Sequence, residues 1–271
     1  MYAAFVLVPL GMSLVYSLFR WDGIGKWRWV GLNNYITVLT DADLLQIIGN
    51  AFQLVLYFTL IPVVLGLAVA AVIREHLGGR FGTITRTILF LPQVIPLVAA
   101  GIAWSWMFAN SGLVNQALNG MGLGHLARGW LGDFTFALPA VGIIGAWVLL
   151  GLCTMLLVTG ITKIDPSLYE AARLDGAGPW QEFFHITLPS LRPEIGVCVT
   201  VTVIAALASF DIVYIATQGG PGIQTTVPGL EIYRLAFAHR QVGLASALAI
   251  FLMVLVLVCV LPIQWLTSVK K

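Results

Sequence analysis

Few side chains in this sequence are placed to do chemistry, and the first candidates are its histidines and cysteines. The histidines are scattered without His-Glu-x-x-His or paired spacing, and the cysteines fall inside apolar runs. A metal site needs several such ligands at short, regular spacing. We therefore expect no metal site and no catalytic residue, with the histidines in loops or interfaces and the cysteines as small buried apolar groups. The histidines are His76, His125, His185 and His239, and the cysteines are Cys153, Cys198 and Cys259.

The sequence also lacks a nucleotide site of the P-loop type. At Gly25-Lys26, Arg20 stands where the first glycine of that motif belongs, and Trp27 stands where the serine or threonine belongs. Backbone groups of a glycine-rich loop are what hold the phosphates in such sites. We expect no cofactor to be bound by this chain, so that any use of ATP must lie in another subunit.

Asp211 is the one carboxylate placed well inside an apolar run, with Glu194 and Glu231 as the nearest charges. A helix from Glu194 to Asp211 rises about 25 Å, which puts Asp211 in the outer part of a bilayer. A charge there must be paired, wetted or turned toward a cavity. Asp211 is a candidate pathway residue; the alternative is that it tethers the outer end of its helix.

Three neighbours of Asp211 have side chains suited to holding a polar solute. Phe210, Asp211, Tyr214 and Gln218 follow near-helical spacing and would line one face of a helix. Aromatic rings beside hydrogen-bonding groups can hold a sugar, although aromatic stripes are also common in plain packing. These four residues form the predicted substrate pathway.

A polar stretch, residues 163–193, interrupts the apolar runs. Asp165 before a proline is a typical N-cap, and Gly176 suits a left-handed C-terminal cap, so Pro166–Asp175 is predicted to be a short helix. A second short helix should begin at Gly178-Pro179 and end near Leu188, because the residue before Pro189 is disfavoured in the helical region. The stretch is predicted to be a compact helix-turn-helix at a membrane surface.

The first of these helices carries a small apolar spot with a charged rim. Ala171 and Ala172 have no bulk, so a partner's backbone could approach closely there, and Glu170, Arg173 and Asp175 surround them. Such a surface is suited to docking. The alternative is an amphipathic segment that lies on the lipid headgroups.

The composition requires that these segments be positioned by a membrane domain. The chain has 271 residues, is 59% hydrophobic and only 10% charged, and has a mean hydropathy of +0.94. These values lie far outside the range of soluble globular proteins. A formal net charge of +2, without any basic run, excludes nucleic acid as an expected partner.

We predict an all-α membrane protein with one transmembrane domain over residues 1–271. The first apolar run lacks a basic leader and a cleavage site, so it is predicted to be a retained helix. Six runs are long enough to span a bilayer, which puts both termini on one side. The predicted spans are residues 1–19, 50–73, 87–109, 136–162, 195–217 and 242–268.

Basic residues indicate the orientation. Arg74, Arg80 and Arg86 lie between the second and third spans, and Lys270-Lys271 ends the chain. Cytoplasmic loops carry an excess of Lys and Arg, and here that excess is small. The distribution favours cytoplasmic termini, which also places the 163–193 stretch in the cytoplasm.

The 163–193 stretch as a whole resembles a known motif. Glu170-Ala171-Ala172, then Gly176, Ile186 and Leu188-Pro189 resemble the EAA loop in the permease subunits of binding-protein-dependent ABC importers. The resemblance implies a type I importer fold, with the loop between the fourth and fifth spans. Its first helix would be a coupling helix in a cleft of an ABC ATPase.

This resemblance implies roles for individual residues of the coupling helix. Glu170 would meet a basic residue of the ATPase, Ala171 and Ala172 would form the close-packing surface, and Asp175 and Gly176 would lie at the turn.

A second resemblance concerns the solute. The segment from Phe210 to Gly222, F-D-I-V-Y-I-A-T-Q-G-G-P-G, with Glu231 and Arg234 downstream, looks like the first permease subunit of carbohydrate importers of the maltose, glycerol-3-phosphate and trehalose type. It implies a second homologous permease, an ABC ATPase dimer that uses ATP and magnesium, and an extracytoplasmic solute-binding protein. The location implied is the bacterial or archaeal cytoplasmic membrane.

Two other classes of protein remain open at this stage. An ion-coupled secondary transporter would need acidic or basic relays inside the membrane, and Asp211 is a lone candidate for one. An intramembrane enzyme or assembly factor would need a catalytic constellation that the sequence lacks.

Overall fold

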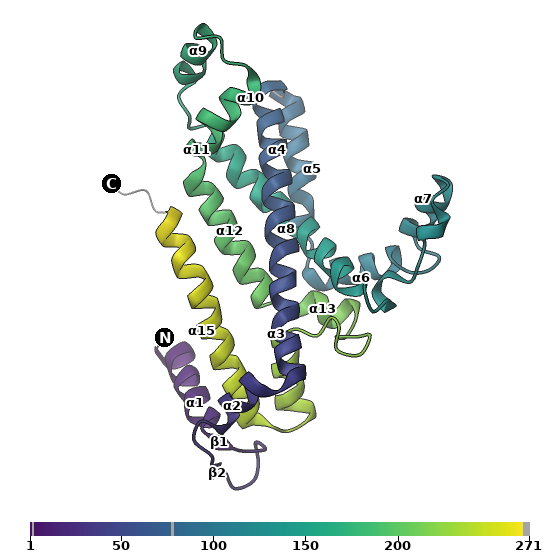
Figure 1. The fold of residues 1–271 in the computed structure, drawn as a ribbon, viewed down its shortest axis with the longest axis vertical. Coiled ribbons are helices and arrows are strands. Elements are labelled where there is room, and N and C mark those ends of the chain that lie inside the picture. Colours follow the sequence, from purple (N-terminus) through teal and green to yellow (C-terminus); the bar gives the residue numbers. More distant parts are fainter. Residues whose placement is uncertain (2, 77–78, 268–271) are drawn as a thin grey trace.

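The computed structural model describes residue 1 and residues 3–76 and 79–267, and nearly all of it is helical. The helices form an elongated bundle, with α9 (Pro166–Leu174) at one end of the long axis and a small hairpin at the other (Figure 1). The predicted Lys270-Lys271 tail and the side chains of Arg74, Arg80 and Arg86 lie outside the described residues.

The chain begins with one apolar helix that ends at the hairpin. A π-helical segment η1 (Ala3–Leu7) runs into α1 (Val8–Ser17), and β1 (Phe19–Arg20) then pairs antiparallel with β2 (Arg28–Trp29). Helix α2 (Asn33–Thr40) follows. The buried Asn34 side chain donates hydrogen bonds to the carbonyl oxygens of Ser17 and Phe19, at 2.8 and 2.9 Å. These bonds satisfy the C-terminal end of α1 and fix α2 against it.

The second span is longer than predicted. It is built from α3 (Ala42–Val55), the π-helical segment η2 (Leu56–Leu60) and α4 (Ile61–His76), and residues 42–72 are apolar enough to cross a membrane. It begins before the predicted residue 50 because Asp41 caps α3 by accepting hydrogen bonds from the amides of Asp43 and Leu44, both at 3.0 Å.

The third predicted span, 87–109, is two helices rather than one. Two residues separate helix α5 (Gly79–Val94) from α6 (Leu97–Met107). The chain bends by 104° between Thr87–Val94 and Leu97–Met107. Pro96 disfavours the helical conformation at Ile95 and offers no amide hydrogen, so the helix cannot continue through this point. After α6 the chain forms α7 (Leu113–Gly120) and two 3₁₀ turns, η3 (Gly124–Leu126) and η4 (Trp130–Gly132).

Helix α8 (Ala137–Ile161) is the central element of the bundle. Its apolar window is 67% buried, against 28% for each of the other two unbroken spans. Glycines on α8 allow this close packing: at Gly151 an added Cβ would contact the Leu89 carbonyl oxygen and lie 2.9 Å from the Phe90 Cα. Inside a membrane the hydrophobic effect does not drive helices together, and small residues allow the close backbone approach that packing requires.

The fifth predicted span, 195–217, is also broken. Helix α12 (Arg192–Leu207) ends before Ala208, and the short helix α13 (Asp211–Ala216) starts again after Phe210. At the break Gly229 lies so close to the Ser209 carbonyl that a Cβ would be 2.7 Å from its oxygen. The backbone leaves the helix where this neighbouring segment packs against it.

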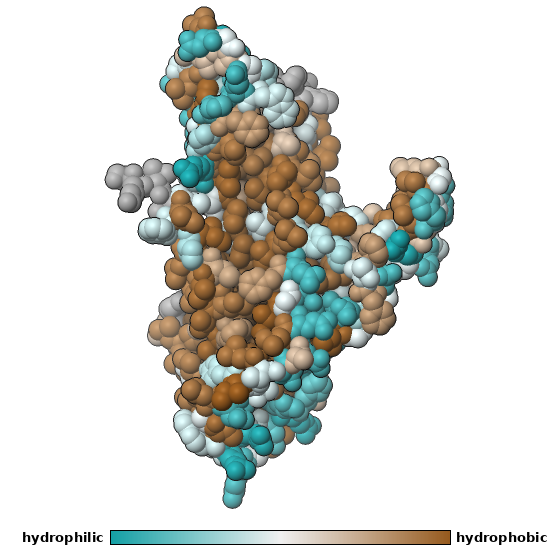
Figure 2. Space-filling model, viewed as in Figure 1, coloured by the Kyte–Doolittle hydropathy of each residue, from teal (hydrophilic) through white to brown (hydrophobic). Residues whose placement is uncertain are grey.

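The remaining helices close the bundle. Helix α14 (Pro228–Tyr233) and the π-helical segment η6 (Arg234–Ala238) lead into α15 (Val242–Thr267), the third unbroken apolar span. Of the described residues, three helices are long and apolar enough to cross a membrane, and two bent pairs pass the same test. Ala3–Ser17 is a shorter apolar helix. On the face seen in Figure 2, hydrophobic residues cover most of the middle of the bundle, as the lipid phase requires.

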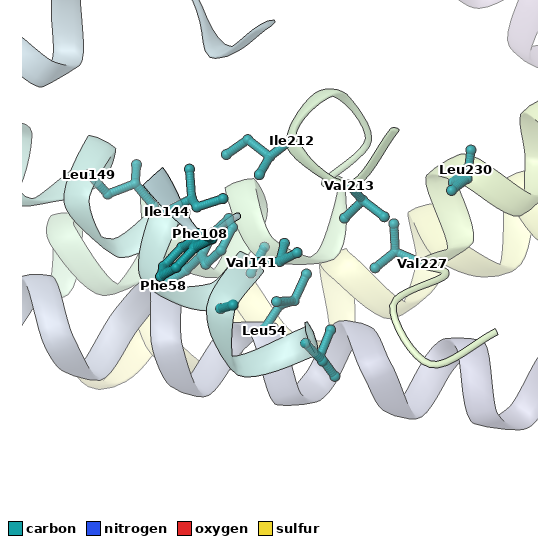
Figure 3. Packing of buried hydrophobic residues seen from close by; sticks show 13 residues of the cluster. Leu54, Phe58, Phe108, Val141, Ile144, Leu149, Ile212, Val213, Val227 and Leu230 are labelled. Carbon is teal, nitrogen blue, oxygen red and sulfur yellow. The ribbon is translucent and has the colours of Figure 1, made fainter. Parts of the chain in front are cut away.

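Two buried clusters hold the two halves of α8 in the bundle. In the first, Leu54, Phe58, Val141 and Val213 belong to a core that joins α3, η2, α8, α13 and α14 (Figure 3). In the second, Leu191, at the loop end of the bundle, packs with residues of α4, α8 and α12. Both clusters depend on α8.

We expect Gly151→Ala to destabilise the protein, because the added methyl meets the backbone of α5, which cannot move as a side chain could. The cost of such overpacking is about 1 to 3 kcal/mol. The thermal unfolding midpoint of the purified chain in detergent measures it. Gly49→Ala is the control, because nothing lies within 4 Å of an added Cβ there. Equal midpoints for the two variants would contradict the close approach.

Candidate functional site

The helix predicted from Asp165 and Gly176 forms as those residues require. Asp165 accepts a hydrogen bond from the Ser167 amide at 2.9 Å, and this bond holds the pKa of the Asp165 carboxyl below its usual value. At the other end, Gly176 has φ +82°. The Ala177 amide donates to the Ala172 carbonyl and the Gly176 amide to that of Arg173, at 2.9 and 3.0 Å. These two bonds form the Schellman cap of α9.

The second helix of this loop runs further than predicted. Segments α10 (Pro179–Glu182), η5 (Phe183–Thr187) and α11 (Leu188–Ser190) are continuous, so the predicted end near Leu188 is wrong. In the π-helical segment the Leu188 amide bonds to the Phe183 carbonyl, five residues back. This wider turn makes room for Pro189, which would otherwise clash with the preceding turn of an α-helix.

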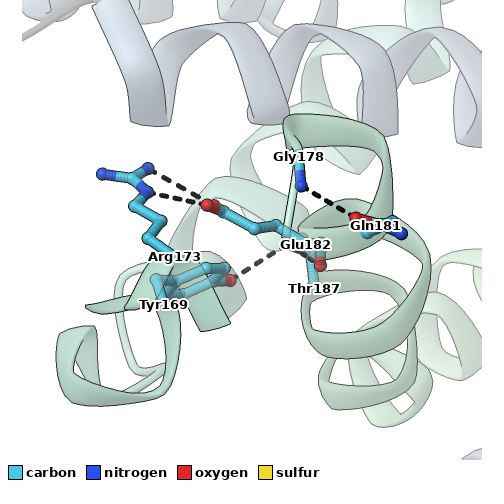
Figure 4. Close-up of polar contacts among 6 residues, drawn as sticks. All are labelled: Tyr169, Arg173, Gly178, Gln181, Glu182 and Thr187. Atoms are coloured by element: carbon cyan, nitrogen blue, oxygen red, sulfur yellow. Dashed lines mark hydrogen bonds and ion pairs between the residues drawn. The ribbon is translucent and has the colours of Figure 1, made fainter. Parts of the chain in front are cut away.

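A partly buried ion pair holds α9 against the second helix. Arg173 Nε donates to Glu182 Oε1 at 2.7 Å and Nη2 donates to Oε2 at 3.3 Å (Figure 4). The Glu182 side chain is only 3% exposed, whereas that of Arg173 is 60% exposed. The Tyr169 and Thr187 hydroxyls form a buried hydrogen bond of 3.0 Å beside this pair. Together these contacts fix the orientation of α9, and we call them the loop clamp.

The predicted coupling residues occupy the outer surface of the loop. Glu170, Ala171, Asp175 and Gly176 are exposed, and Ala172 is half-buried. Ala172, Asp175 and Gly176 line one groove of about 340 Å³, while Glu170 and Ala171 lie outside its lining. Large apolar side chains are also exposed on the loop, with Leu174 at 89% and Trp180 at 76%. A surface of this kind favours a protein partner over plain solvent.

Two of the predicted pathway residues, Phe210 and Asp211, line an open cavity of about 550 Å³ between α5, α6, α8, α12 and α13. Both helix breaks open onto it, since Pro96 and Ser209 also belong to its lining. Where a helix breaks within a membrane, its freed backbone groups need a cavity or protein around them.

Sequence reasoning missed Gln93, which lines the same cavity. Its Oε1 atom is buried and accepts no hydrogen bond. Such an oxygen favours a ligand that can donate a hydrogen bond. The available signal was a polar residue next to Pro92 and shortly before Pro96 in an otherwise apolar run.

Tyr214 and Gln218 do not belong to this lining, and the predicted helical face does not reach Gln218. Helix α13 covers only 211–216, which leaves Gln218 in a left-handed turn with φ +49°. The Gln218 carbonyl accepts a hydrogen bond from Arg234. Tyr214 instead stacks on Phe210, with ring centres 5.3 Å apart and planes 12° apart, and Tyr233 meets both rings edge-on. Asp211 is exposed.

Within the described part of the chain, no three His, Cys, Asp or Glu side chains come close enough to hold a metal ion.

Near the hairpin end, burial raises the pKa of the Glu231 carboxyl, and the opposing effects of Arg234 and His239 are smaller. The chemical features of the described site are therefore a rigid surface loop at one end and a cavity between broken helices.

Apolar spans, interrupted helices around a cavity and a folded polar loop at one end define a membrane transport component. The chain belongs to the family described as the binding-protein-dependent transport system inner membrane component, whose model matches residues 62–268. It is thus the membrane component of a binding-protein-dependent ABC importer, and a multi-pass membrane protein. This membership does not favour the ion-coupled alternative.

Two relatives each match most of the chain. It is 32% identical to the diacetylchitobiose uptake system permease protein NgcF of Streptomyces coelicolor, over 95% of this chain and 76% of that protein. It is 34% identical to the trehalose/maltose transport system permease protein MalF of Thermococcus litoralis, over 93% of this chain and 85% of that protein.

The fold matches a solved ABC transporter involved in the import of the acidic polysaccharide alginate. The TM-score is 0.82 at 25% identity, covering 98% of this chain and 90% of that one. The predicted all-α importer fold is confirmed.

We expect Glu182→Gln to loosen α9 in the loop clamp, because the variant loses a charge-assisted hydrogen bond in a buried position. Such bonds contribute about 1.5 to 3 kcal/mol, so amide exchange across α9 should be about tenfold faster or more. Hydrogen exchange measured by mass spectrometry tests this. Lys163→Gln removes the exposed 3.4 Å pair with Glu194 and is the control, with little change expected. Similar exchange rates in both variants would contradict the clamp.

Proposed function

We propose that this chain and a second, homologous permease together form the pathway for a sugar or sugar-like solute. An extracytoplasmic binding protein delivers the solute, and a separate ABC ATPase dimer drives transport through the 163–193 loop. The single observation that carries this proposal is the loop clamp. It presents Glu170 and Ala171 on a rigid, exposed helix at the end of the bundle.

The proposed coupling surface is α9. A rigid helix transmits displacement because its own hydrogen bonds and caps hold it as one body, and the Arg173–Glu182 pair carries that displacement to the second helix. The fully buried Leu191 then connects the loop to α8 and α12. In this proposal Glu170 meets a basic residue of the ATPase, and Ala171 and Ala172 allow close approach.

The chemistry of ATP hydrolysis belongs to the partner in this proposal. The chain itself is a non-catalytic subunit, binds no cofactor and supplies no catalytic residue. ATP and magnesium act on the ATPase dimer at the cytoplasmic face. The chain lies in a bacterial or archaeal cytoplasmic membrane, with α9 in the cytoplasm and the hairpin end outside.

The cavity between the helix breaks is the proposed solute path through this subunit. A sugar presents hydroxyl donors and apolar ring faces, which match the unpaired Gln93 oxygen, the Asp211 carboxylate and the Phe210 ring. The compounds named for the similar proteins, diacetylchitobiose, trehalose and maltose, and alginate, are all carbohydrates. They support a carbohydrate as the solute class.

Transport would proceed by alternating access. A ligand shifts a conformational equilibrium only through unequal affinity for the two states. The loaded binding protein and ATP must therefore each bind the outward-open state more tightly, and hydrolysis then returns the pair of permeases to the inward-open state.

Two measurements test the proposal as a whole. Extraction of the tagged chain from its native membrane in mild detergent should recover a P-loop ATPase and a second permease, identified by mass spectrometry. Vesicles that contain this complex should take up labelled oligosaccharide only with ATP and the binding protein. Uptake by the chain alone, driven by an ion gradient without ATP, would overturn the proposal.

For the coupling helix, we expect Glu170→Ala to weaken ATPase recovery about tenfold, because a charge pair at a subunit boundary contributes about 1 to 3 kcal/mol. Co-purification across a salt series measures this effect. Asp43→Ala, an exposed carboxylate on α3 at the other end of the bundle, is the matched control and should leave recovery unchanged. Equal recovery for both variants at every salt concentration would remove the role of Glu170.

For the solute path, we expect Phe210→Ala to raise the KM for uptake roughly tenfold, which corresponds to about 1.4 kcal/mol of lost contact. Loss of the ring removes both its cavity surface and its stack with Tyr214. Phe134→Ala is the control, since this ring is 68% exposed and lies outside the cavity lining. An unchanged KM in Phe210→Ala, with normal ATPase recovery, would place the solute elsewhere.

A further inference from the structure

A second cavity, of about 620 Å³, lies at the hairpin end of the molecule, far from α9 (Figure 1). Four cationic side chains contribute to its lining. Arg20 comes from β1, Lys26 from the turn between the strands, Arg28 from β2 and Arg240 from the residue pair before α15. Segments more than two hundred residues apart in the sequence thus bring positive charge to one hollow.

Two of these cations are held directly opposite each other. In the register of the hairpin Arg20 pairs with Arg28, and Phe19 pairs with Trp29. Like charges directly opposite in an antiparallel pair repel and destabilise it. Arg240 also has an unfavourable backbone conformation, with φ +52°, a region that residues other than glycine seldom adopt. The rest of the fold therefore holds the four cations together despite the Arg20–Arg28 repulsion and the unfavourable backbone conformation of Arg240.

The chain neutralises this cluster only in part. Asp22 is the carboxylate in the cavity wall, and its Oδ1 already accepts hydrogen bonds from the Ile24 and Gly25 amides, at 3.0 and 2.7 Å. Among the residues that the structure describes, none of the four cations forms an ion pair. One carboxylate, whose charge acts on Arg240, stands against four cations, and the excess of positive charge is what an external anion can satisfy.

The surroundings of the cavity indicate the kind of anion. The aromatic face of the hairpin forms one cluster with the end of α1: Tyr16 lies 4.7 Å from Trp21, and Phe19 lies 5.0 Å from both Trp27 and Trp29, between ring centres. Trp27 and Trp29 are 54% and 61% exposed. Exposed tryptophans at the end of an apolar helix mark the depth of the lipid headgroups.

We propose that this cavity binds the phosphodiester headgroup of an anionic phospholipid in the leaflet at the hairpin end. Guanidinium groups donate paired hydrogen bonds to phosphate oxygens, and Trp21, which packs on Tyr16 and Trp27, lines the same cavity. A soluble anion would gain only from the basic groups, whereas a lipid would also contact the Trp21 ring. The site is separate from both the loop and the proposed solute path.

The test uses the full chain, purified in mild detergent and supplied with phosphatidylglycerol or phosphatidylcholine, with bound lipid counted by native mass spectrometry. Wild type should retain phosphatidylglycerol preferentially. A basic residue near an anionic membrane surface strengthens binding about fivefold, so the double variant Arg28→Gln/Arg240→Gln should retain about 25-fold less. Arg192→Gln, the same change at the opposite end, should retain the wild-type amount. Equal phosphatidylglycerol retention in the double variant and wild type overturns the proposal.

A stability measurement guards against a variant that simply unfolds. In lipid-free detergent Arg28→Gln should unfold at a temperature equal to or above that of wild type, because it relieves the Arg20–Arg28 repulsion. Added phosphatidylglycerol should then raise the midpoint of wild type more than that of the variant. A midpoint of Arg28→Gln far below that of wild type without lipid would show that the two arginines do not repel, and would contradict the argument.

Two further arms separate the lipid from other anions. Inorganic phosphate titrated against wild type should leave the midpoint nearly unchanged, and a shift as large as that of phosphatidylglycerol would assign the site to a soluble phosphate instead. If the double variant kept its phosphatidylglycerol but lost capture of the binding protein, the cluster would be a protein-docking surface, and the lipid proposal would fail.

Discussion

Backbone hydrogen bonding in hydrocarbon constrains this structure more than any other interaction. A helix satisfies its own amides and carbonyls, so each point where a helix breaks must be enclosed by protein or open onto a polar cavity. The breaks at Pro96 and at Ser209 both open onto the cavity that contains Gln93 and Asp211. The helix breaks and the polar side chains thus occur at the same cavity. There the freed backbone groups and the polar side chains are kept out of contact with lipid.

Helix α8 provides the frame against which those breaks are held. Gly151 lets α5 approach α8 closely, Gly66 of α4 does the same for that helix, and the two ends of α8 belong to different buried clusters. The cluster around Leu54 and Val213 packs one half of α8 against α3, α13 and α14, whereas the one around Leu191 reaches the 163–193 loop. Close packing of this kind transmits displacement rather than absorbing it, because dense interiors have low compressibility.

The two ends of the molecule differ in what they present. At one end the loop clamp holds a short, capped helix with exposed apolar and acidic groups, as a surface for a protein partner requires. At the other end the hairpin separates an aromatic face from a basic one through the simple alternation of two strands. Phe19 and Trp29 share one side, and Arg20 and Arg28 share the other. The membrane lies between these ends, which accounts for the hydrophobic middle of the bundle on the face seen in Figure 2.

The sequence by itself determined the features that depend on local chemistry. Composition required a membrane protein, Asp165 and Gly176 fixed α9 through its caps, and the spacing from Glu170 to Pro189 identified the family later confirmed by the match over residues 62–268. Tertiary structure decided what depends on distant segments. The break after Leu207 arises where Gly229 packs on the Ser209 carbonyl, which separates Phe210 and Asp211 from Gln218. Helix periodicity cannot reveal such a contact. The partner of Arg173, the position of Gln93 in the cavity wall and the meeting of Arg240 with the hairpin were likewise set by folding, because only packing brings these charges and polar atoms together.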